Sequence, residues 1–166
     1  MKNIGIISLI LAIVAFSCGK VSFNMSGASF GTEKTCQVVY FENRAPIVNA
    51  RLAALMTDAL KDKIQSSTSL KLVNSNADVM FEGEITGYSI QSGQITAQNR
   101  AETDRLTVTV KIKYTNMIDP EKSYDKSFSR FSEASGGMDP SAETRAVELI
   151  LPEIMEDIYN EAFAQW

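Results

Sequence analysis

The sequence contains no histidine, and this absence removes several kinds of chemistry at once. Histidine is the commonest general base near neutral pH and a frequent zinc ligand, so Ser-His and Cys-His nucleophile pairs and imidazole metal sites are excluded. Only two cysteines occur, Cys18 and Cys36. If Cys18 is modified, Cys36 has no partner for an intrachain disulfide and no second thiolate for a zinc site. We therefore expect Cys36 to be packed in the interior.

Other patterns that carry chemistry are also missing. The sequence has no glycine-rich phosphate loop, no Gly-x-Ser-x-Gly nucleophile motif and no aspartate-rich calcium loop. Its formal net charge is −4, which disfavours binding of a polyanion through overall charge, and no nucleic-acid partner is expected. The sequence thus predicts a protein that is not an enzyme and has no cofactor and no metal site.

The N-terminus lacks an apolar run long enough to remain as a membrane span. Lys2 is followed by a mostly apolar segment, Ile4 to Phe16, of 13 residues, whereas a bilayer-spanning helix needs roughly 20. This length and the positive flank are typical of an export signal. Small residues, Ser17 and Gly19, bracket Cys18, as acylation of a lipoprotein requires. We predict a lipoprotein signal peptide over residues 1–17 and acylation of Cys18, with palmitate among its acyl chains. The alternative is a plain secretory signal with a coincidental cysteine.

The residues after Cys18 predict where the protein resides. No acidic residue follows Cys18 immediately, and in the best-studied sorting system that absence directs a lipoprotein to the outer membrane. Residues 18–34 are rich in Ser, Gly and Thr and are expected to form the acylated N-terminus and a tether, with a short strand near residues 21–25. Residues 35–166 are long enough for one domain with a core. We expect a lipid anchor on the periplasmic side of the cell outer membrane.

Apolar periodicity predicts the elements of this domain. The clean alternation from Arg105 to Thr115 indicates a strand with one buried and one wet face. Asn49 is a plausible N-cap for a helix, and the serines from Ser66 onward are expected to end that helix. A second helix is expected from Pro140 to Trp166, kinked or split into two collinear segments at Pro152. The other expected strands lie at residues 35–41, 70–73, 79–90 and 123–131. This order predicts an α+β fold, a two-layer sandwich of a mainly antiparallel or mixed sheet with two helices on one face.

Basic residues gather on two of the predicted strands. Arg105, Lys111 and Lys113 share the wet face of one strand, and Lys126 and Arg130 lie on its predicted hairpin neighbour. Such residues could contact the phosphates of an anionic glycolipid. Alternatively, they only keep the sheet soluble and protect it from edge pairing. The strand register that decides whether all five share one face is not fixed by the sequence.

Two further pairs on the strand at residues 79–90 each allow two interpretations. Glu82 and Glu84 lie two residues apart on one face, where they could act as acid and base or bind Ca²⁺. No further oxygen ligands follow at useful spacing, so a solvated strand face accounts for both. Gly83 and Gly87 are expected to share one face and to allow close approach by a helix or an aromatic ring.

Five segments in order resemble the LptE family, in particular its shorter, divergent branch. They are Tyr40–Pro46, Leu72–Asp78, Phe81–Tyr88, Leu106–Lys111 and Ser127–Phe131. The resemblance implies a sheet with two helices on one side. It also implies an outer-membrane lipoprotein that plugs the LptD β-barrel, assists its assembly and serves lipopolysaccharide transport to the cell surface. In this family basic residues on the sheet contact the glycolipid.

Two other functions remain open at this point. A periplasmic auxiliary lipoprotein of an envelope transporter would have the same anchor and a similar fold. A small lipoprotein hydrolase would need carboxylates such as Glu82 to carry out catalysis, and the absence of histidine disfavours it.

Overall fold

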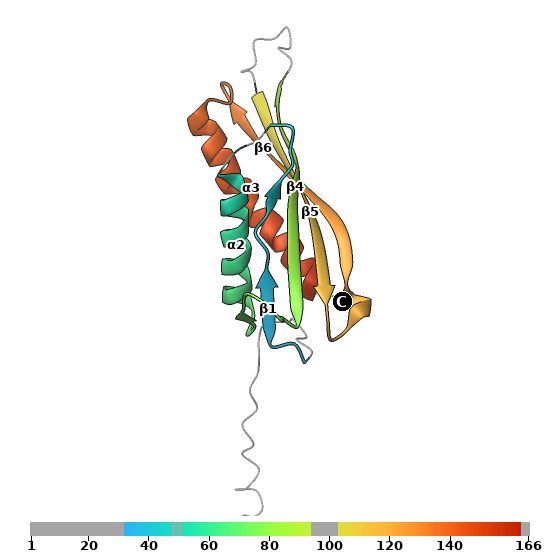
Figure 1. Ribbon diagram of the computed structural model, residues 1–166. Coiled ribbons are helices and arrows are strands. Elements are labelled where there is room, and N and C mark those ends of the chain that lie inside the picture. The colour runs from blue at the N-terminus through green and yellow to red at the C-terminus, as the bar shows by residue number, and fades with distance from the viewer. Residues whose placement is uncertain (1–31, 48, 50, 94–102, 164–166) are drawn as a thin grey trace, which may run out of the picture.

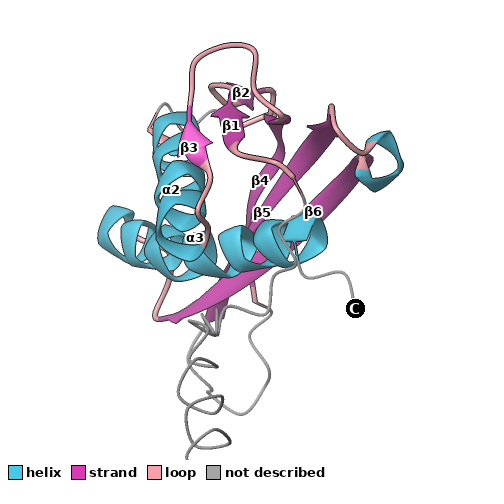
Figure 2. Cartoon of the chain, turned by 90° about the horizontal axis from the view of Figure 1, so that it is seen from below, coloured by secondary structure: helices cyan, strands magenta, loops and turns pink. Residues whose placement is uncertain are grey.

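The protein is an α+β domain in which two helices cover one face of a six-stranded sheet. A computed structural model describes residues 32–47, 49, 51–93 and 103–163. Both helices lie on the same side of the sheet, and the other face is left open (Figures 1 and 2). The predicted α+β two-layer architecture is confirmed. The predictions for the signal peptide, Cys18 and the short strand near residues 21–25 concern residues outside the described part of the chain.

The sheet is mixed, with parallel pairing on one side and antiparallel pairing on the other. Its strands are β1 (Thr35–Val38), β2 (Glu42–Asn43), β3 (Lys71–Leu72), β4 (Val79–Ser92), β5 (Thr103–Asn116) and β6 (Tyr124–Ser135). The order is β3-β1-β4-β5-β6, with β2 also pairing with β4. Strands β1, β2 and β3 pair in parallel, whereas β4, β5 and β6 form an antiparallel meander. A short 3₁₀ helix, η1 (Pro120–Lys122), lies between β5 and β6.

Alternation along β5 separates the core from the open face, as predicted. Its apolar side chains Leu106, Val108, Val110 and Ile112 are fully buried beneath the helices, while Arg105, Lys111 and Lys113 are exposed. Because antiparallel partners directly opposite each other share a face, the β5 pattern also sets the two faces of β4 and β6. The pairing of β4 and β6 with β5 therefore determines which charged residues lie next to each other on the open face.

Both helices begin close to the predicted positions, and α2 also ends close to the predicted one. Helix α2 (Leu52–Ser67) starts after Asn49, whose side-chain oxygen accepts a hydrogen bond from the N–H of Arg51 at 3.1 Å. The prediction of Asn49 as N-cap is therefore wrong by two residues, because it forms a turn that precedes the helix. Helix α3 (Pro140–Phe163) is one continuous helix through Pro152. The split alternative is excluded, and Pro152 itself lies on the exposed side.

The strand predicted over residues 35–41 is broken, and Phe41 explains why. The chain leaves β1 after Val38 and resumes as β2 at Glu42, which turns the ring of Phe41 onto β4. A Cβ atom added at Gly83 would lie only 2.4 Å from that ring. The prediction that Gly83 admits an aromatic ring is confirmed, since only glycine leaves room for this contact.

Candidate functional site

The open face of the sheet carries most of the predicted site residues. β5 presents Lys111 and Lys113 there, and β4 presents Glu82 and Glu84 beside them. A shallow hollow of about 240 Å³ lies between these strands and the segment that joins β1 to β2. The residues around it are Val39, Tyr40, Glu42, Glu82, Gly83, Glu84, Lys111, Lys113 and Asp125. The hollow is polar and open to solvent, so it suits a charged surface group rather than an enclosed small molecule.

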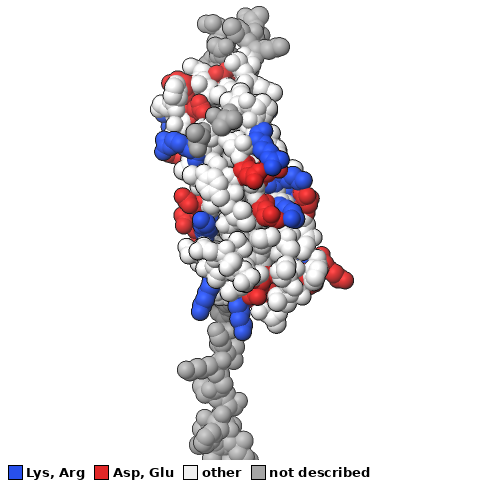
Figure 3. Space-filling model, viewed as in Figure 1, with Lys and Arg blue, Asp and Glu red and all other residues white. Residues whose placement is uncertain are grey.

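Each of the three predicted basic residues on this face is paired with a carboxylate. Arg105 lies 2.6 Å from Glu133, Lys111 lies 3.0 Å from Asp125, and Lys113 lies 2.7 Å from Glu82. The hydrogen bond that Lys113 donates to Glu82 raises the pKa of this lysine. Two lysines against the four carboxylates around the hollow leave a formal charge of 2 − 4 = −2. Basic and acidic side chains are also intermixed over the surface visible in Figure 3.

Lys126 and Arg130 lie on the opposite face of the sheet. Their cross-strand partners are Ile112 and Val108, which point into the core. From the edge strand β6 the two long side chains reach over α3. Lys126 contacts Glu161 at 2.7 Å. Arg130 donates two hydrogen bonds to the carboxylate of Asp157, at 2.7 and 2.6 Å. The five basic residues are therefore split, with three on the open face and two joining β6 to α3.

A bulge in β4 changes the faces of the two predicted glycines. The register with β5 shifts between Ile85 and Gly87, so Gly83 lies on the core face and Gly87 on the open face opposite Thr109. The prediction that Gly83 and Gly87 share one face is wrong, because the inserted residue reverses the alternation. Glu82 and Glu84 precede the bulge and do share the open face, as predicted.

The carboxylates of the open face make ion pairs with neighbouring basic residues. Glu84 lies 3.5 Å from Arg44, which also pairs with Glu42. Within the described ranges, no group of three or more acidic or cysteine side chains is arranged to hold a metal ion. The interpretation of Glu82 and Glu84 as a solvated strand face agrees with this arrangement.

Aromatic side chains near the charged pairs were not singled out by the sequence analysis. Tyr40 is exposed and lines the hollow. Phe131 is exposed on the same face, and the guanidinium of Arg105 lies 4.3 Å from the centre of its ring. Phe128, three residues earlier, is instead partly buried against the core. Odd and even positions of β6 differ in this way because of its register with β5, which no local pattern in the sequence determines.

Two buried groups that could take part in nucleophilic or acid–base chemistry, the thiol of Cys36 and the hydroxyl of Tyr88, have raised pKa values. Cys36 is buried and unpaired, as predicted, and burial raises the pKa of its thiol to about 12. Burial, aided by a hydrogen bond to Glu143, likewise raises the pKa of Tyr88 to about 12. Asn49 lies beside this pair and contacts both side chains. Neither group is poised to exchange a proton near neutral pH.

The amino-acid sequence of this domain identifies the family to which the chain belongs. A sequence model of the LptE family, described as lipopolysaccharide-assembly, matches residues 33–162. The chain belongs to the LptE family. No curated protein is similar enough to the chain to count as a match.

Solved structures with little sequence identity share the fold of this LptE-family domain. The hypothetical protein CT253 from Chlamydia trachomatis aligns with a TM-score of 0.53 at 10% identity, covering 80% of this chain and 99% of its own. Protein XCC0632 from Xanthomonas campestris aligns with a TM-score of 0.54 at 12% identity, covering 78% and 86%. A minor lipoprotein from Acinetobacter baumannii aligns with a TM-score of 0.50 at 10% identity, covering 76% and 91%. Over the residues described here, neither helix is long and apolar enough to cross a membrane.

Proposed function

We propose that this LptE-family member is a non-catalytic lipoprotein, acylated at Cys18, that plugs an LptD-like outer-membrane β-barrel and assists its assembly. The barrel would be the partner through which lipopolysaccharide reaches the cell surface. The observation that carries this proposal is the family match over residues 33–162, nearly the whole described domain. The protein would be held at the periplasmic side of the outer membrane by its N-terminal lipid, since a multiply acylated cysteine anchors without a transmembrane helix.

The geometry of the domain supports a plug better than an enzyme. Strands β4 and β5 each contain 14 residues and so extend about 46 Å. That length exceeds the apolar band of an outer-membrane barrel, which is about 25 Å tall. The domain is also slender, with one open polar sheet face and one helix-covered face (Figures 1 and 2). A polar barrel interior would accept such a surface without requiring an apolar interface.

We also propose that Lys111 and Lys113 provide the glycolipid contact, with Arg105 at its margin. Their ion pairs with carboxylates are solvent-exposed, and exposed pairs contribute little to stability. A phosphate group can therefore compete with Asp125 or Glu82 for a lysine, because breaking an exposed pair costs little. The formal charge of −2 around the hollow opposes the exchange, so we expect a weak contact. Lys126 and Arg130 belonged to the predicted set, but they lie on the helix-covered face of the sheet, away from the hollow.

Affinity purification tests the proposed partner. The full-length protein carrying a C-terminal tag, extracted in mild detergent from its native membrane, should retain a large β-barrel protein in a stable complex identified by mass spectrometry. The same chain with Cys18→Ser serves as the control for anchoring and should retain far less barrel. Recovery of the tagged protein as a monomer, or with inner-membrane ATPase components instead, would contradict the proposal.

Direct binding tests the proposed glycolipid contact. The double variant Lys111→Gln, Lys113→Gln should bind lipopolysaccharide micelles severalfold more weakly than the unaltered protein, because two cations that face phosphate are lost. The control Lys61→Gln, Lys126→Gln removes the same charge from α2 and from the helix-side face and should bind normally. An equal loss of binding in both double variants would show that only overall charge matters, and it would contradict the proposed contact.

A further inference from the structure

The turn that follows β5 exposes two adjacent apolar side chains. Met117 is 67% exposed and Ile118 is 51% exposed. The turn is nevertheless firmly held: the buried side chain of Asn116 accepts hydrogen bonds from the N–H groups of Ile118 and Asp119, at 2.9 and 2.8 Å. The N–H of Met117 donates to the carbonyl of Asp78 at 2.8 Å. The exposure of Met117 and Ile118 is thus a property of the folded domain.

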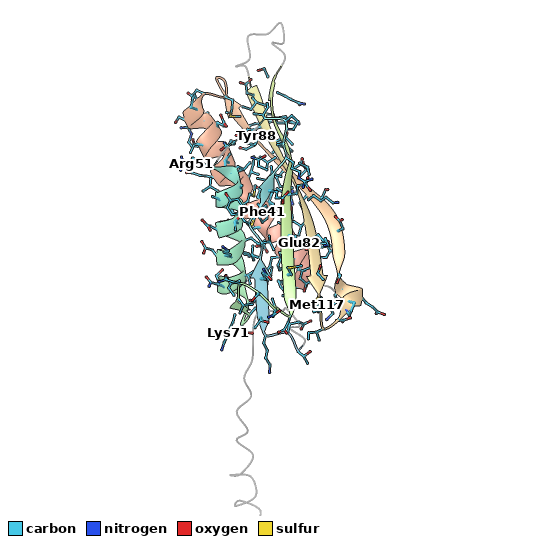
Figure 4. All side chains as sticks on the ribbon, in the orientation of Figure 1. Phe41, Arg51, Lys71, Glu82, Tyr88 and Met117 are labelled. Atoms are coloured by element: carbon cyan, nitrogen blue, oxygen red, sulfur yellow. The ribbon has the colours of Figure 1, made fainter. Side chains whose placement is uncertain are left out.

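This turn lies against the segment through which the N-terminus enters the domain. Asn116 donates a hydrogen bond to the carboxylate of Glu33 at 2.8 Å. The carboxylate of Asp78 accepts hydrogen bonds from the N–H groups of Lys34 and Thr35, at 2.7 and 2.9 Å, which lower the pKa of Asp78. In Figure 4, Met117 and Lys71 lie at this same end of the molecule, opposite Tyr88.

The position of this end relative to Cys18 limits its distance from the membrane. Glu33 is 33 − 18 = 15 residues from Cys18, a stretch that spans at most about 50 Å when fully extended. If Cys18 is acylated, the anchored chain joins the domain at the end with Met117, so this end can reach the bilayer with the least extension of the chain. The tether then raises the local concentration of lipid at this turn, so that even a weak apolar contact is populated.

The charges around the turn indicate that such a contact is apolar rather than electrostatic. The turn, together with the residues linked to it through hydrogen bonds of Glu33, Lys34 and Asp78, carries three lysines and four carboxylates, a formal charge of 3 − 4 = −1. They are Lys34, Lys71, Lys122, Glu33, Asp78, Asp119 and Glu121. Attraction to anionic lipid headgroups therefore contributes little. Two aliphatic side chains on a convex turn fit the fluid boundary between headgroups and acyl chains, where buried apolar area provides the binding energy.

We propose that Met117 and Ile118 insert into the interfacial layer of the bilayer that holds the acyl chains of Cys18. This inference rests on the proposed acylation of Cys18 and adds a second membrane contact to it. Two contacts at one end hold the β5–η1 end of the domain at the periplasmic surface of the bilayer. This is the end that stays outside when the opposite end of the sheet, where β4 ends and β5 begins, enters a barrel.

Fluorescence of a label at position 117 tests the inference. Full-length acylated protein carrying Met117→Cys is labelled with an environment-sensitive nitrobenzoxadiazole dye and reconstituted into phosphatidylethanolamine–phosphatidylglycerol vesicles. Cys36 is buried and should stay unlabelled. Leu149→Cys is the matched control, because Leu149 is 63% exposed and lies beside the last residues of β6, toward the other end of the sheet. The label at 117 should shift to shorter wavelength and be quenched by brominated acyl chains, in low and high salt alike, whereas the label at 149 should do neither.

The outcomes separate this inference from the proposed anchor. A vesicle-bound protein whose label at 117 behaves like the label at 149 would overturn the inserted turn and leave the anchor standing. A protein that does not float with vesicles would overturn the anchor and, with it, the inserted turn. A label at 117 that is shielded without lipid, increasingly so at higher protein concentration, would mean self-association at this turn and would also overturn the inference.

Discussion

Phe41 connects three parts of the domain through one residue. Its backbone N–H donates to the hydroxyl of Thr57 on α2 at 3.0 Å, and that hydroxyl in turn donates to the carbonyl of Ala53 at 2.7 Å. Its ring rests on β4 over Gly83. The residue is fully buried. Helix α2, the β1–β2 segment and the central strand therefore meet at this contact, and the space at Gly83 decides whether they fit.

Substitution Gly83→Ala should lower the free energy of unfolding by about 1–3 kcal/mol, because the new methyl group would overlap the ring of Phe41 in a packed core. Denaturant titration measures this loss. Gly87→Ala is the matched control: its Cβ would lie 3.1 Å from the side chain of Thr109 on the open face, a milder conflict. Adding Phe41→Leu to Gly83→Ala should restore part of the stability. Equal losses at Gly83 and Gly87 would contradict the role given to Phe41.

Helix α3 shows how a whole element tolerates a residue that local rules disfavour. Pro152 lacks the N–H that would bond to the preceding turn, yet the helix continues from Pro140 to Phe163. On its buried side lie Val147, Ile150, Ile154, Met155 and Ile158. Apolar burial on this scale exceeds the cost of one proline, which is about 3 kcal/mol in a helix interior. Tertiary packing, and not local propensity, keeps α3 continuous.

Pro152→Ala should therefore raise the free energy of unfolding, by about 1–2 kcal/mol once the greater freedom of the unfolded chain is allowed for. Thermal and denaturant unfolding both measure the change. Pro140→Ala is the control, since Pro140 occupies the first position of the helix, where proline is well tolerated. Its substitution should leave stability unchanged or slightly lower it. A loss of stability in Pro152→Ala would mean that the proline is required by the packing around it.

Elements built from one-sided patterns could be predicted from the sequence, and those that depend on distant contacts could not. The alternation in β5 reports burial directly, so the faces of this strand were predicted correctly. The break after Val38 depends on where Phe41 meets Gly83, 42 residues away, and the bulge before Gly87 depends on register with β5. The split of the basic residues has the same origin, because the ladder places Lys126 opposite Ile112.

On the scale of the whole molecule, the two ends of the long axis differ, and this difference would set the orientation of the domain at the membrane. The described chain enters the domain at the β5–η1 end, and the sheet extends about 46 Å from there. The open face carries paired charges over this length, and the helices cover the other face. With the proposed anchor at one end, such a domain would enter a barrel from the periplasmic side in one orientation and present its open face along the lumen.

The most direct test of the central claim, that this protein serves lipopolysaccharide assembly, is the amount of lipopolysaccharide exposed on intact cells after the protein is depleted. Surface labelling with a lipopolysaccharide-specific antibody should fall while total lipopolysaccharide is maintained, and expression of the unaltered chain should restore it. Expression of the Cys18→Ser chain should restore it poorly. Unchanged surface labelling in cells from which the protein has been removed would contradict the claim.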